Sequence, residues 1–194
     1  MDNDLKQLKG LVDAVMPLPE ADWLEFAVLW KPFSARRKET LTAMGEPEKY
    51  LYFVLEGVQR VFLLDESGRE ATLIFTYAPS FGGVLDAMLA RQPSRYCYET
   101  LSASRFIRAP YSEIKLLADR KKAMADFMHV SLTAALSGLL IRMAELQCFS
   151  SEEKFRSLLS RSPHILQHVP NKYLANYLGI DPTNFSKLIN RMLI

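Results

Sequence analysis

The stretch Val169–Arg191 reads VPNKYLANYLGIDPTNFSKLINR and predicts two short amphipathic helices joined by a sharp turn. The apolar faces consist of Leu174, Ala175 and Leu178 in the first helix and Phe185, Leu188 and Ile189 in the second. Gly179 lies where the chain must turn, because glycine adopts a positive φ without strain. Asp181 is suitably placed as an N-cap and Pro182 as the first helical residue. With a small Ala175 permitting close approach, the pattern predicts a helix-turn-helix.

The outward face of the second predicted helix carries only hydrogen-bonding or cationic side chains. A helix-turn-helix places the N-terminal end of its second helix in the major groove of DNA. From Cys148 onward six lysines and arginines face three acidic residues, which favours local phosphate contacts although the whole chain carries a net charge of only +2. A plain helical hairpin with a solvated polar face is the alternative. The candidate DNA-binding residues are Asn171, Lys172, Thr183, Asn184, Ser186, Lys187, Asn190 and Arg191.

The central part of the chain, from Leu41 to Ile114, has the composition of an antiparallel sandwich or barrel. Its apolar segments are short, rich in Val, Phe, Tyr, Thr and Ile, and separated by turns that contain glycine or proline. The clearest pair of strands lies in Val58–Tyr77, where Gly68 supplies the turn. Before this region, the helical spacing of apolar residues between Asp4 and Lys31 predicts two helices.

A helical period returns at Ser112 and continues through one helix of about 30 residues. One apolar stripe has the spacing 4, 3, 4, 3 that is typical of a helix paired with another helix, and it consists of Leu132, Leu136, Leu139, Met143 and Leu146. A neighbouring stripe is small in its middle and consists of Phe127, Ser131, Ala134, Gly138 and Ile141. Because packing on one barrel explains only one stripe, we expect a twofold dimer through this helix.

Several negative observations limit the function classes. All three histidines, His129, His164 and His168, lie outside the barrel segment, and the sequence has no nucleophile elbow, P-loop or dinucleotide fingerprint. His164 and His168 are expected in a loop, because prolines flank them. We therefore expect no enzyme, no metal site and no cofactor. The N-terminus lacks an apolar signal region and no run of 18 apolar residues occurs, which predicts a cytoplasmic protein.

A small antiparallel barrel, a long pairing helix and a terminal helix-turn-helix, in that order, resemble the Crp/Fnr family of bacterial transcription regulators. The segment EKYLYFVLEGVQRVFLLDESGREATLIFTYAPSFGG, residues 48–83, is similar to that family's cyclic-nucleotide-binding roll. The segments PSRYCYETL, residues 93–101, and RSLLSRSPHILQHVPNKYLANYLGIDPTNFSKL, residues 156–188, resemble a divergent branch found in Bacteroidetes.

The resemblance implies an α+β fold in three parts. Residues 1–118 form a cyclic-nucleotide-binding-like effector domain with N-terminal helices, residues 119–148 a dimerisation helix, and residues 149–194 a helix-turn-helix domain. The closing RMLI leaves no obvious wing after the recognition helix. Implied partners are double-stranded DNA, a second copy of the chain and RNA polymerase, with no membrane. The alternative is a ligand-sensing or protein-interaction module with this fold that has lost DNA binding.

The effector pocket implied by the resemblance departs from the family pattern. Its residues here are Phe81, Gly82, Gly83, Ser94, Arg95 and Tyr96. Effector-binding members use a Gly-Glu pair, whose Glu binds the ribose hydroxyl, and an Arg-Ser pair, whose Arg binds the cyclic phosphate. Gly83 occupies the Glu position and cannot accept that hydrogen bond, while a one-residue gap decides whether Ser94 or Arg95 replaces the Arg. We therefore expect no cAMP binding, and either an unidentified small-molecule effector or none.

Overall fold

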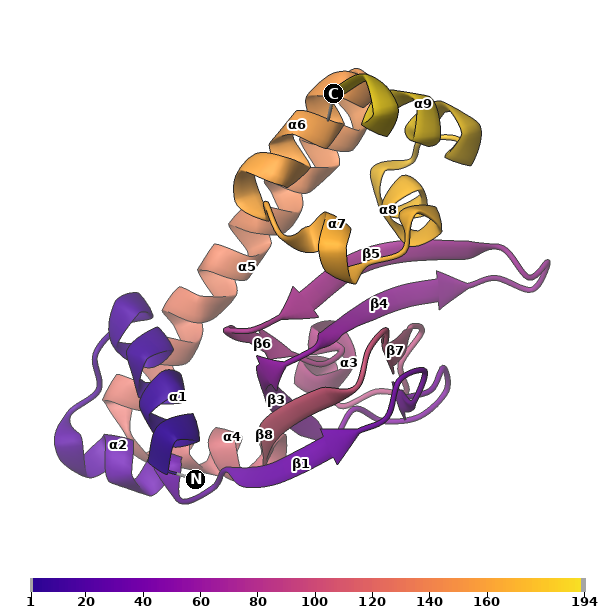
Figure 1. Cartoon of the computed structure of the whole chain (residues 1–194). Coiled ribbons are helices and arrows are strands. Elements are labelled where there is room, and N and C mark those ends of the chain that lie inside the picture. Colours follow the sequence, from indigo (N-terminus) through magenta and orange to yellow (C-terminus); the bar gives the residue numbers. More distant parts are fainter. Residues whose placement is uncertain (1, 193–194) are drawn as a thin grey trace.

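The computed structural model describes residues 2–192, and these residues form an α+β fold (Figure 1). A roll of two antiparallel sheets occupies the lower part of the view, and a long helix rises from it to a group of C-terminal helices. The fold class expected from the sequence is confirmed. Leu193 and Ile194, the end of the RMLI segment that bears on a wing, lie outside the described residues.

The described helices and strands have the following bounds. The helices are α1 Asp2–Val15, α2 Glu20–Ala27, α3 Leu85–Ala90, α4 Tyr111–Arg120, α5 Lys122–Cys148, α6 Ser151–Arg161, α7 Ile165–His168, α8 Asn171–Leu178 and α9 Pro182–Met192. The strands are β1 Lys31–Ala35, β2 Thr40–Thr42, β3 Tyr50–Glu56, β4 Val58–Leu64, β5 Glu70–Tyr77, β6 Ser80–Gly82, β7 Cys97–Thr100 and β8 Ser104–Pro110.

The roll consists of two four-stranded sheets with the strand orders β1-β8-β3-β6 and β2-β7-β4-β5. The predicted hairpin is confirmed, since β4 pairs with β5 from Val58 opposite Tyr77 to Leu64 opposite Glu70. Gly68 has a φ of +80° in the intervening turn. Large aromatic side chains fill the space between the sheets, and the fully buried ones are Tyr52, Tyr98 and Phe106. The roll is therefore a packed core rather than an open barrel.

The two predicted N-terminal helices are confirmed as α1 and α2, and both pack with the first half of α5 against the β1-β8-β3-β6 sheet. Their shared core contains Leu8, Val12, Phe26, Trp30 and Phe127. The rings of Phe26 and Trp30 meet edge to face at 5.4 Å between centroids, a favoured aromatic geometry. This core attaches the start of α5 rigidly to the roll.

The predicted pair of C-terminal helices is present as α8 and α9. Gly179 has a φ of +63° in the turn, and the Asp181 carboxylate accepts hydrogen bonds from the amides of Thr183 and Asn184 at 2.9 and 3.2 Å. A capping box of Ser150 and Glu153 begins α6. The core of these helices contains Phe155, Leu174, Ala175, Leu178 and Phe185. The local turn and cap predictions are thus confirmed.

Two short helices were not predicted. The loop expected around His164 and His168 contains the single turn α7, Ile165–His168. Pro163 does not prevent this helix, because proline disrupts a helix only at positions where its ring clashes with the preceding turn. The segment after Gly83 forms α3, whose six residues are too few to reveal a helical period.

Candidate nucleic-acid interface and effector site

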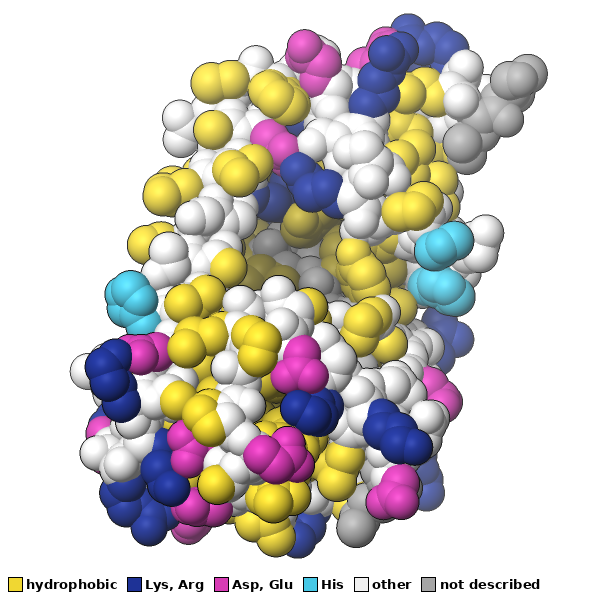
Figure 2. Space-filling model, turned by 90° about the vertical axis from the view of Figure 1, so that its left-hand side faces the viewer, with side chains coloured by type: hydrophobic (Ala, Val, Ile, Leu, Met, Phe, Trp, Pro, Cys, Tyr) yellow, Lys and Arg dark blue, Asp and Glu magenta, His cyan; other side chains and the backbone are white. Residues whose placement is uncertain are grey.

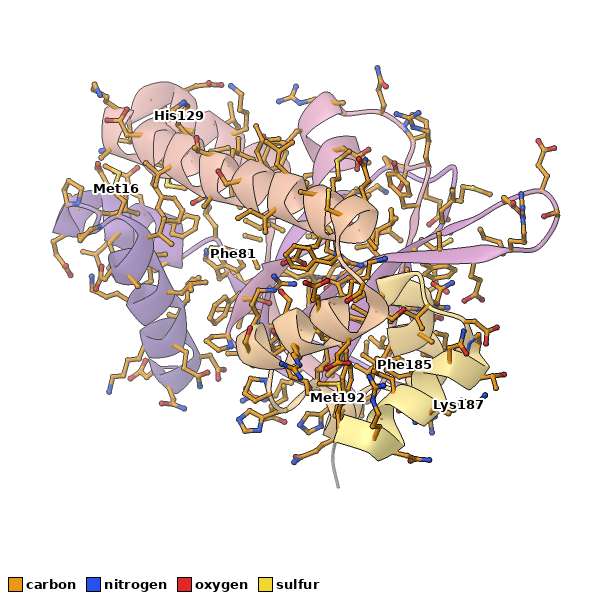
Figure 3. All side chains as sticks on the ribbon, turned by 90° about the horizontal axis from the view of Figure 1, so that it is seen from above. Met16, Phe81, His129, Phe185, Lys187 and Met192 are labelled. Carbon is orange, nitrogen blue, oxygen red and sulfur yellow. The ribbon has the colours of Figure 1, made fainter. Side chains whose placement is uncertain are left out.

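The outward side of α9 presents a continuous polar surface. Its exposed residues are Thr183, Asn184, Ser186, Lys187, Asn190 and Arg191. Phe185 and Leu188 lie on the opposite side in the core, and the rings of Phe185 and Phe155 meet edge to face at 5.6 Å. Figure 3 shows Lys187 on the outer side of α9. The structure thus brings the candidate residues of this helix together on one accessible face.

Three of the candidate DNA-binding residues, Asn171, Lys172 and Arg191, differ in whether their side chains are already engaged. Arg191 forms an ion pair with Glu152 of α6, so its guanidinium is already engaged. Asn171 and Lys172 lie exposed in the first turn of α8, as an anion-binding helix start requires. The Lys172 ammonium lies 4.6 Å from the centre of the Tyr173 ring. Lys172 and Lys187 are therefore the accessible lysines of the helical pair.

Helix α8 is attached to the roll through strand β5. The Asn176 side-chain amide donates to the Glu70 carbonyl at 2.7 Å, and its oxygen accepts from the Thr72 amide at 2.6 Å. Helix α8 lies beside β5 (Figure 1), and these two bonds join it to this edge strand. Beside them, the rings of Phe75 and Tyr177 lie 4.9 Å apart. The position of α9 is thus tied to the roll and not only to α5.

Arg60 lies at the centre of the contact between the roll and α8. Its side chain is only 2% exposed, and its guanidinium pairs with Glu99 and Glu70, each at 2.6 Å. It is sandwiched between the rings of Phe62 and Tyr173, at 3.9 and 4.0 Å from their centres. The hydrogen bond from Arg60 holds the pKa of Glu70 below its usual range. A buried arginine is thus neutralised within the roll and covered by α8.

Lys38 adds a second polar link across the same contact. Its ammonium donates to the Tyr173 hydroxyl at 2.6 Å and pairs with Glu99 at 3.2 Å. The sequence analysis missed this cluster, because Arg60 stands between ordinary strand residues and Tyr173 has the spacing of a core aromatic. The one signal in the sequence for this cluster was Arg60 itself, an arginine at an inward position of the amphipathic β4–β5 hairpin.

A separate cluster of charged side chains connects α5, α6 and α8. Glu145 is buried and accepts hydrogen bonds from Ser157 at 2.7 Å and from Arg161 at 2.8 Å. The Arg161 hydrogen bond holds the pKa of Glu145 below its usual range. Arg142 stacks on the Tyr177 ring at 3.4 Å and donates to the Tyr177 carbonyl. The junction after α5 is therefore cross-linked by charged groups.

The C-terminal half of α5 exposes a large apolar surface. Four residues of the predicted seam, Leu136, Leu139, Met143 and Leu146, are exposed, and Leu140 and Ile141 extend the surface, while Leu132 is half-buried. Figure 2 shows hydrophobic side chains in a row along the left edge of the molecule, where α5 runs. In the second stripe Phe127 is buried in the roll core, whereas Gly138 is exposed with open space around it. By length and composition alone, α5 would also qualify to cross a membrane.

The six residues expected in an effector pocket do not converge on one cavity. Phe81 faces the N-terminal core and lies near the rings of Trp30, Phe53 and Phe127 (Figure 3). A side chain at Gly82 would overlap the Tyr98 hydroxyl. Gly83 has a φ of +123°, and a side chain there would meet the Tyr50 carbonyl. The cradle expected at this place is thus closed by the protein itself.

The three candidate residues of the next loop, Ser94, Arg95 and Tyr96, do not form a common anion-binding site. Ser94 is buried, and its hydroxyl bonds to both the amide and the carbonyl of Tyr96 within the same turn. Tyr96 itself is half-buried beside the roll core. Arg95 is exposed and forms no ion pair within residues 2–192. The geometry therefore favours Arg95 as a surface residue over a role in gripping a buried phosphate.

Glu48 occupies the space beside Gly83 into which a side chain at that position would project. Its carboxylate accepts from the Val84 amide at 3.1 Å, the Thr42 hydroxyl at 2.7 Å and the Tyr50 amide at 3.3 Å. Burial raises the pKa of Glu48. The Tyr98 hydroxyl bonds to Thr76 at 3.0 Å and is fully buried, which raises its pKa. The sequence analysis missed Glu48, because it lies on a different loop from Gly83.

Residues 32–121, which contain the roll, match the cyclic nucleotide-binding domain family. The roll has the fold of a cyclic nucleotide-binding domain. No curated protein matches the sequence. The comparison with solved structures extends the likeness beyond this domain to α5 and the helices after it, which match the fold of Crp/Fnr regulators.

Three solved structures illustrate the likeness. FixK2 from Bradyrhizobium japonicum has a TM-score of 0.76 at 17% identity, covering 84% of each chain. The c-di-GMP responsive global regulator CLP of Xanthomonas campestris has a TM-score of 0.65 at 13% identity, covering 90% of this chain and 92% of its own. The catabolite activator protein of Thermus thermophilus has a TM-score of 0.55 at 15% identity, covering 92% and 85%. At these identities the similarity concerns the fold.

The closed cradle of the roll leads to a prediction about cAMP. We expect calorimetric titration to detect no binding in the micromolar range, because Gly83 offers no carboxylate for the ribose and Tyr98 fills the adjacent space. A lost charged hydrogen bond alone costs about 1.5–3 kcal/mol, roughly 10- to 150-fold in affinity. A saturable heat with a micromolar dissociation constant would contradict this prediction.

Proposed function

We propose that the chain is a transcription regulator of the Crp/Fnr type that binds double-stranded DNA as a homodimer. In this proposal residues 1–118 are the effector-type domain, residues 119–148 the dimerisation helix and residues 149–194 the helix-turn-helix domain. The observation that carries it is the exposed polar face of α9 on a helical pair whose other side is packed and anchored. The protein would act in the cytoplasm, without catalysis, as a member of the branch found in Bacteroidetes.

The support for DNA binding lies in the local geometry of α8 and α9. Gly179 turns the chain within one residue, and Asp181 caps α9 so that its first turn is well ordered. The exposed N-terminal half of α9 then has the shape and polarity of a helix that enters the major groove. Lys187 reaches outward one turn later, where an ammonium group contacts the guanine acceptors O6 and N7.

The support for a homodimer is the uncovered apolar face of α5. A monomer in water rarely exposes a contiguous apolar surface of this kind, and a twofold axis along α5 would cover it with the same surface of a second copy. Two α9 helices related by that axis would address half-sites about 34 Å apart on one side of the duplex. RNA polymerase becomes a partner if the regulator activates transcription.

Two observations favour the second candidate function, an interaction module that has lost DNA binding. Arg191 is engaged by Glu152, which removes one cation from the DNA-facing side of α9. The net charge of +2 for the whole chain is also small for a DNA-binding protein. Direct titration with DNA separates the two candidates, because DNA binding weakens steeply with salt and protein binding shows little such trend.

The test of the proposed function is a comparison of Lys187→Ala with the parent. On a selected operator the variant should lose about 1–3 kcal/mol of binding free energy, while binding to scrambled DNA should hardly change. Fluorescence anisotropy at two salt concentrations measures both. Lys115→Ala is the control, because Lys115 lies on α4 and pairs with Asp119.

The outcomes distinguish the possible roles of the side chain. Equal losses for Lys187→Ala on both DNAs would reduce Lys187 to a phosphate contact. Arg191→Ala should weaken binding on all sequences alike, and the loss should be small because Glu152 already holds this guanidinium. No salt-dependent DNA binding by the parent would favour the interaction module.

A further inference from the structure

A cavity of about 260 Å³ opens at the mouth of the roll, between the β2–β3 segment and β8. It is lined by Leu41, Thr42, Glu48, Tyr50, Tyr52 and Arg108, among others. We call it the Arg108 cavity. It is lined by none of the six residues that the resemblance assigns to an effector pocket, although Glu48 and Tyr50 separate it from Gly83 of the closed cradle.

Arg108 has no counter-ion among the described residues. Its guanidinium lies flat between two rings, 3.8 Å from the centre of Phe33 and 4.1 Å from that of Tyr50. This half-buried arginine forms no ion pair within residues 2–192, in contrast to Arg105 on the same strand and Arg60 on β4 of the other sheet. The stacking restricts the orientation of the guanidinium, and its N–H groups other than the one bonded to the Tyr52 hydroxyl remain for a planar acceptor.

The carboxylate that lines the same cavity does not neutralise Arg108. Glu48 already accepts hydrogen bonds from Thr42, Val84 and Tyr50, which occupy both of its oxygens. A partly buried cation without a partner is costly, and an incoming anion would remove that cost. The cavity thus combines a pre-oriented guanidinium with an acidic group that is committed elsewhere.

Tyr52 supplies a further donor beside Arg108. Burial and the charge of Glu48 raise the pKa of Tyr52 to about 12, although Arg108 opposes the shift. The hydroxyl therefore keeps its proton at neutral pH and can donate it to an anion. Arg108 donates a hydrogen bond to the oxygen of this hydroxyl, which leaves the O–H itself to donate to a ligand.

We propose that the Arg108 cavity binds a small oxyanion, a carboxylate or phosphate of few heavy atoms. Arg108 would hold it with two parallel N–H bonds and Tyr52 with a third. The volume lies below the roughly 300 Å³ at which pockets for larger organic ligands begin, which favours a small acid over a nucleotide. The residues of the proposed site all belong to the roll, so the test of anion binding does not depend on whether the chain binds DNA.

The experiment is a thermal-stability titration of the full chain at constant ionic strength, with sodium chloride as reference. The probes are sodium acetate, sodium succinate and inorganic phosphate, which separate carboxylate from phosphate ligands. At least one probe should raise the melting temperature along a saturable curve. Arg108→Gln should weaken the apparent affinity about tenfold or more. The affinity of Arg108→Lys should lie between those of the parent and Arg108→Gln, because lysine keeps the charge but lacks the planar guanidinium that donates two parallel hydrogen bonds.

Arg95→Gln is the matched control, because Arg95 is an exposed arginine at the loop expected to bind a phosphate. It should bind the probe as the parent does. Loss of binding in Arg95→Gln, unchanged binding in Arg108→Gln, or no saturable response to any probe would each overturn the proposal. If Arg108→Gln fails to fold, Arg108→Lys and Tyr52→Phe decide, since each should weaken binding in a folded roll.

Discussion

Leu136→Asp is expected to convert the proposed dimer into monomers. The leucine side chain is 58% exposed on α5 and would be enclosed at the centre of the seam by a second copy. A carboxylate there would be buried without a partner, which costs several kcal/mol of association. Sedimentation velocity at micromolar concentration measures the change directly.

Leu116→Asp is the matched control for this prediction. Leu116 lies on α4 with 54% of its surface exposed, so it offers the same substitution at the same exposure outside the seam. The control should remain dimeric, and operator affinity should fall only in Leu136→Asp, because one monomer contacts one half-site. A Leu136→Asp protein that sediments as the same dimer as the parent would show that the seam lies elsewhere.

Arg60→Met is expected to lower the free energy of unfolding by about 3–5 kcal/mol, the usual cost of removing one partner from a buried ion pair. The substitution leaves Glu99 with Lys38 as its remaining cation and removes the guanidinium that stacks on Tyr173. Urea denaturation followed by circular dichroism measures the loss. Trypsin should also cleave between the roll and α8 sooner, because their contact has lost its central group.

Arg105→Met provides the comparison on the other sheet. Arg105 pairs with Asp4 and Glu56, but its side chain is 40% exposed, so the expected cost is below about 1 kcal/mol. A loss in Arg60→Met no greater than in Arg105→Met would mean that the buried cluster contributes little net stability. Replacement of such a cluster by apolar groups is known to be neutral in some proteins, which makes the comparison informative.

The features predictable from the sequence were those governed by neighbouring residues. Gly179 and Asp181 determine the turn and cap through their own backbone and side chain, so the helical pair was predicted in detail. The hairpin around Gly68 was predicted for the same reason. Where an outcome depends on a few residues in a row, spacing and residue type suffice.

The features that escaped prediction join distant parts of the chain. Glu48 reaches Val84, and Arg60 meets both Glu99 and Tyr173, through the packing of the two sheets and of α8. Sequence spacing carries no information about such meetings. The closure of the expected cradle therefore became visible only in three dimensions, although Gly83 had already indicated that cAMP would lack a partner.

The attachment of α8 to β5 through Asn176 has a mechanical consequence for a dimer. The helical pair is bonded both to the roll and to α5. Each protomer of the proposed dimer would therefore rotate as one rigid body about the point where the two α5 helices cross. From Leu136, at the centre of the seam, to the end of α5 at Cys148 the helix makes an arm of about 18 Å. A tilt of about 11° would move its tip by about 3.4 Å, close to the rise of one base pair. The angle at which two copies cross would thus select operator length in single base-pair steps.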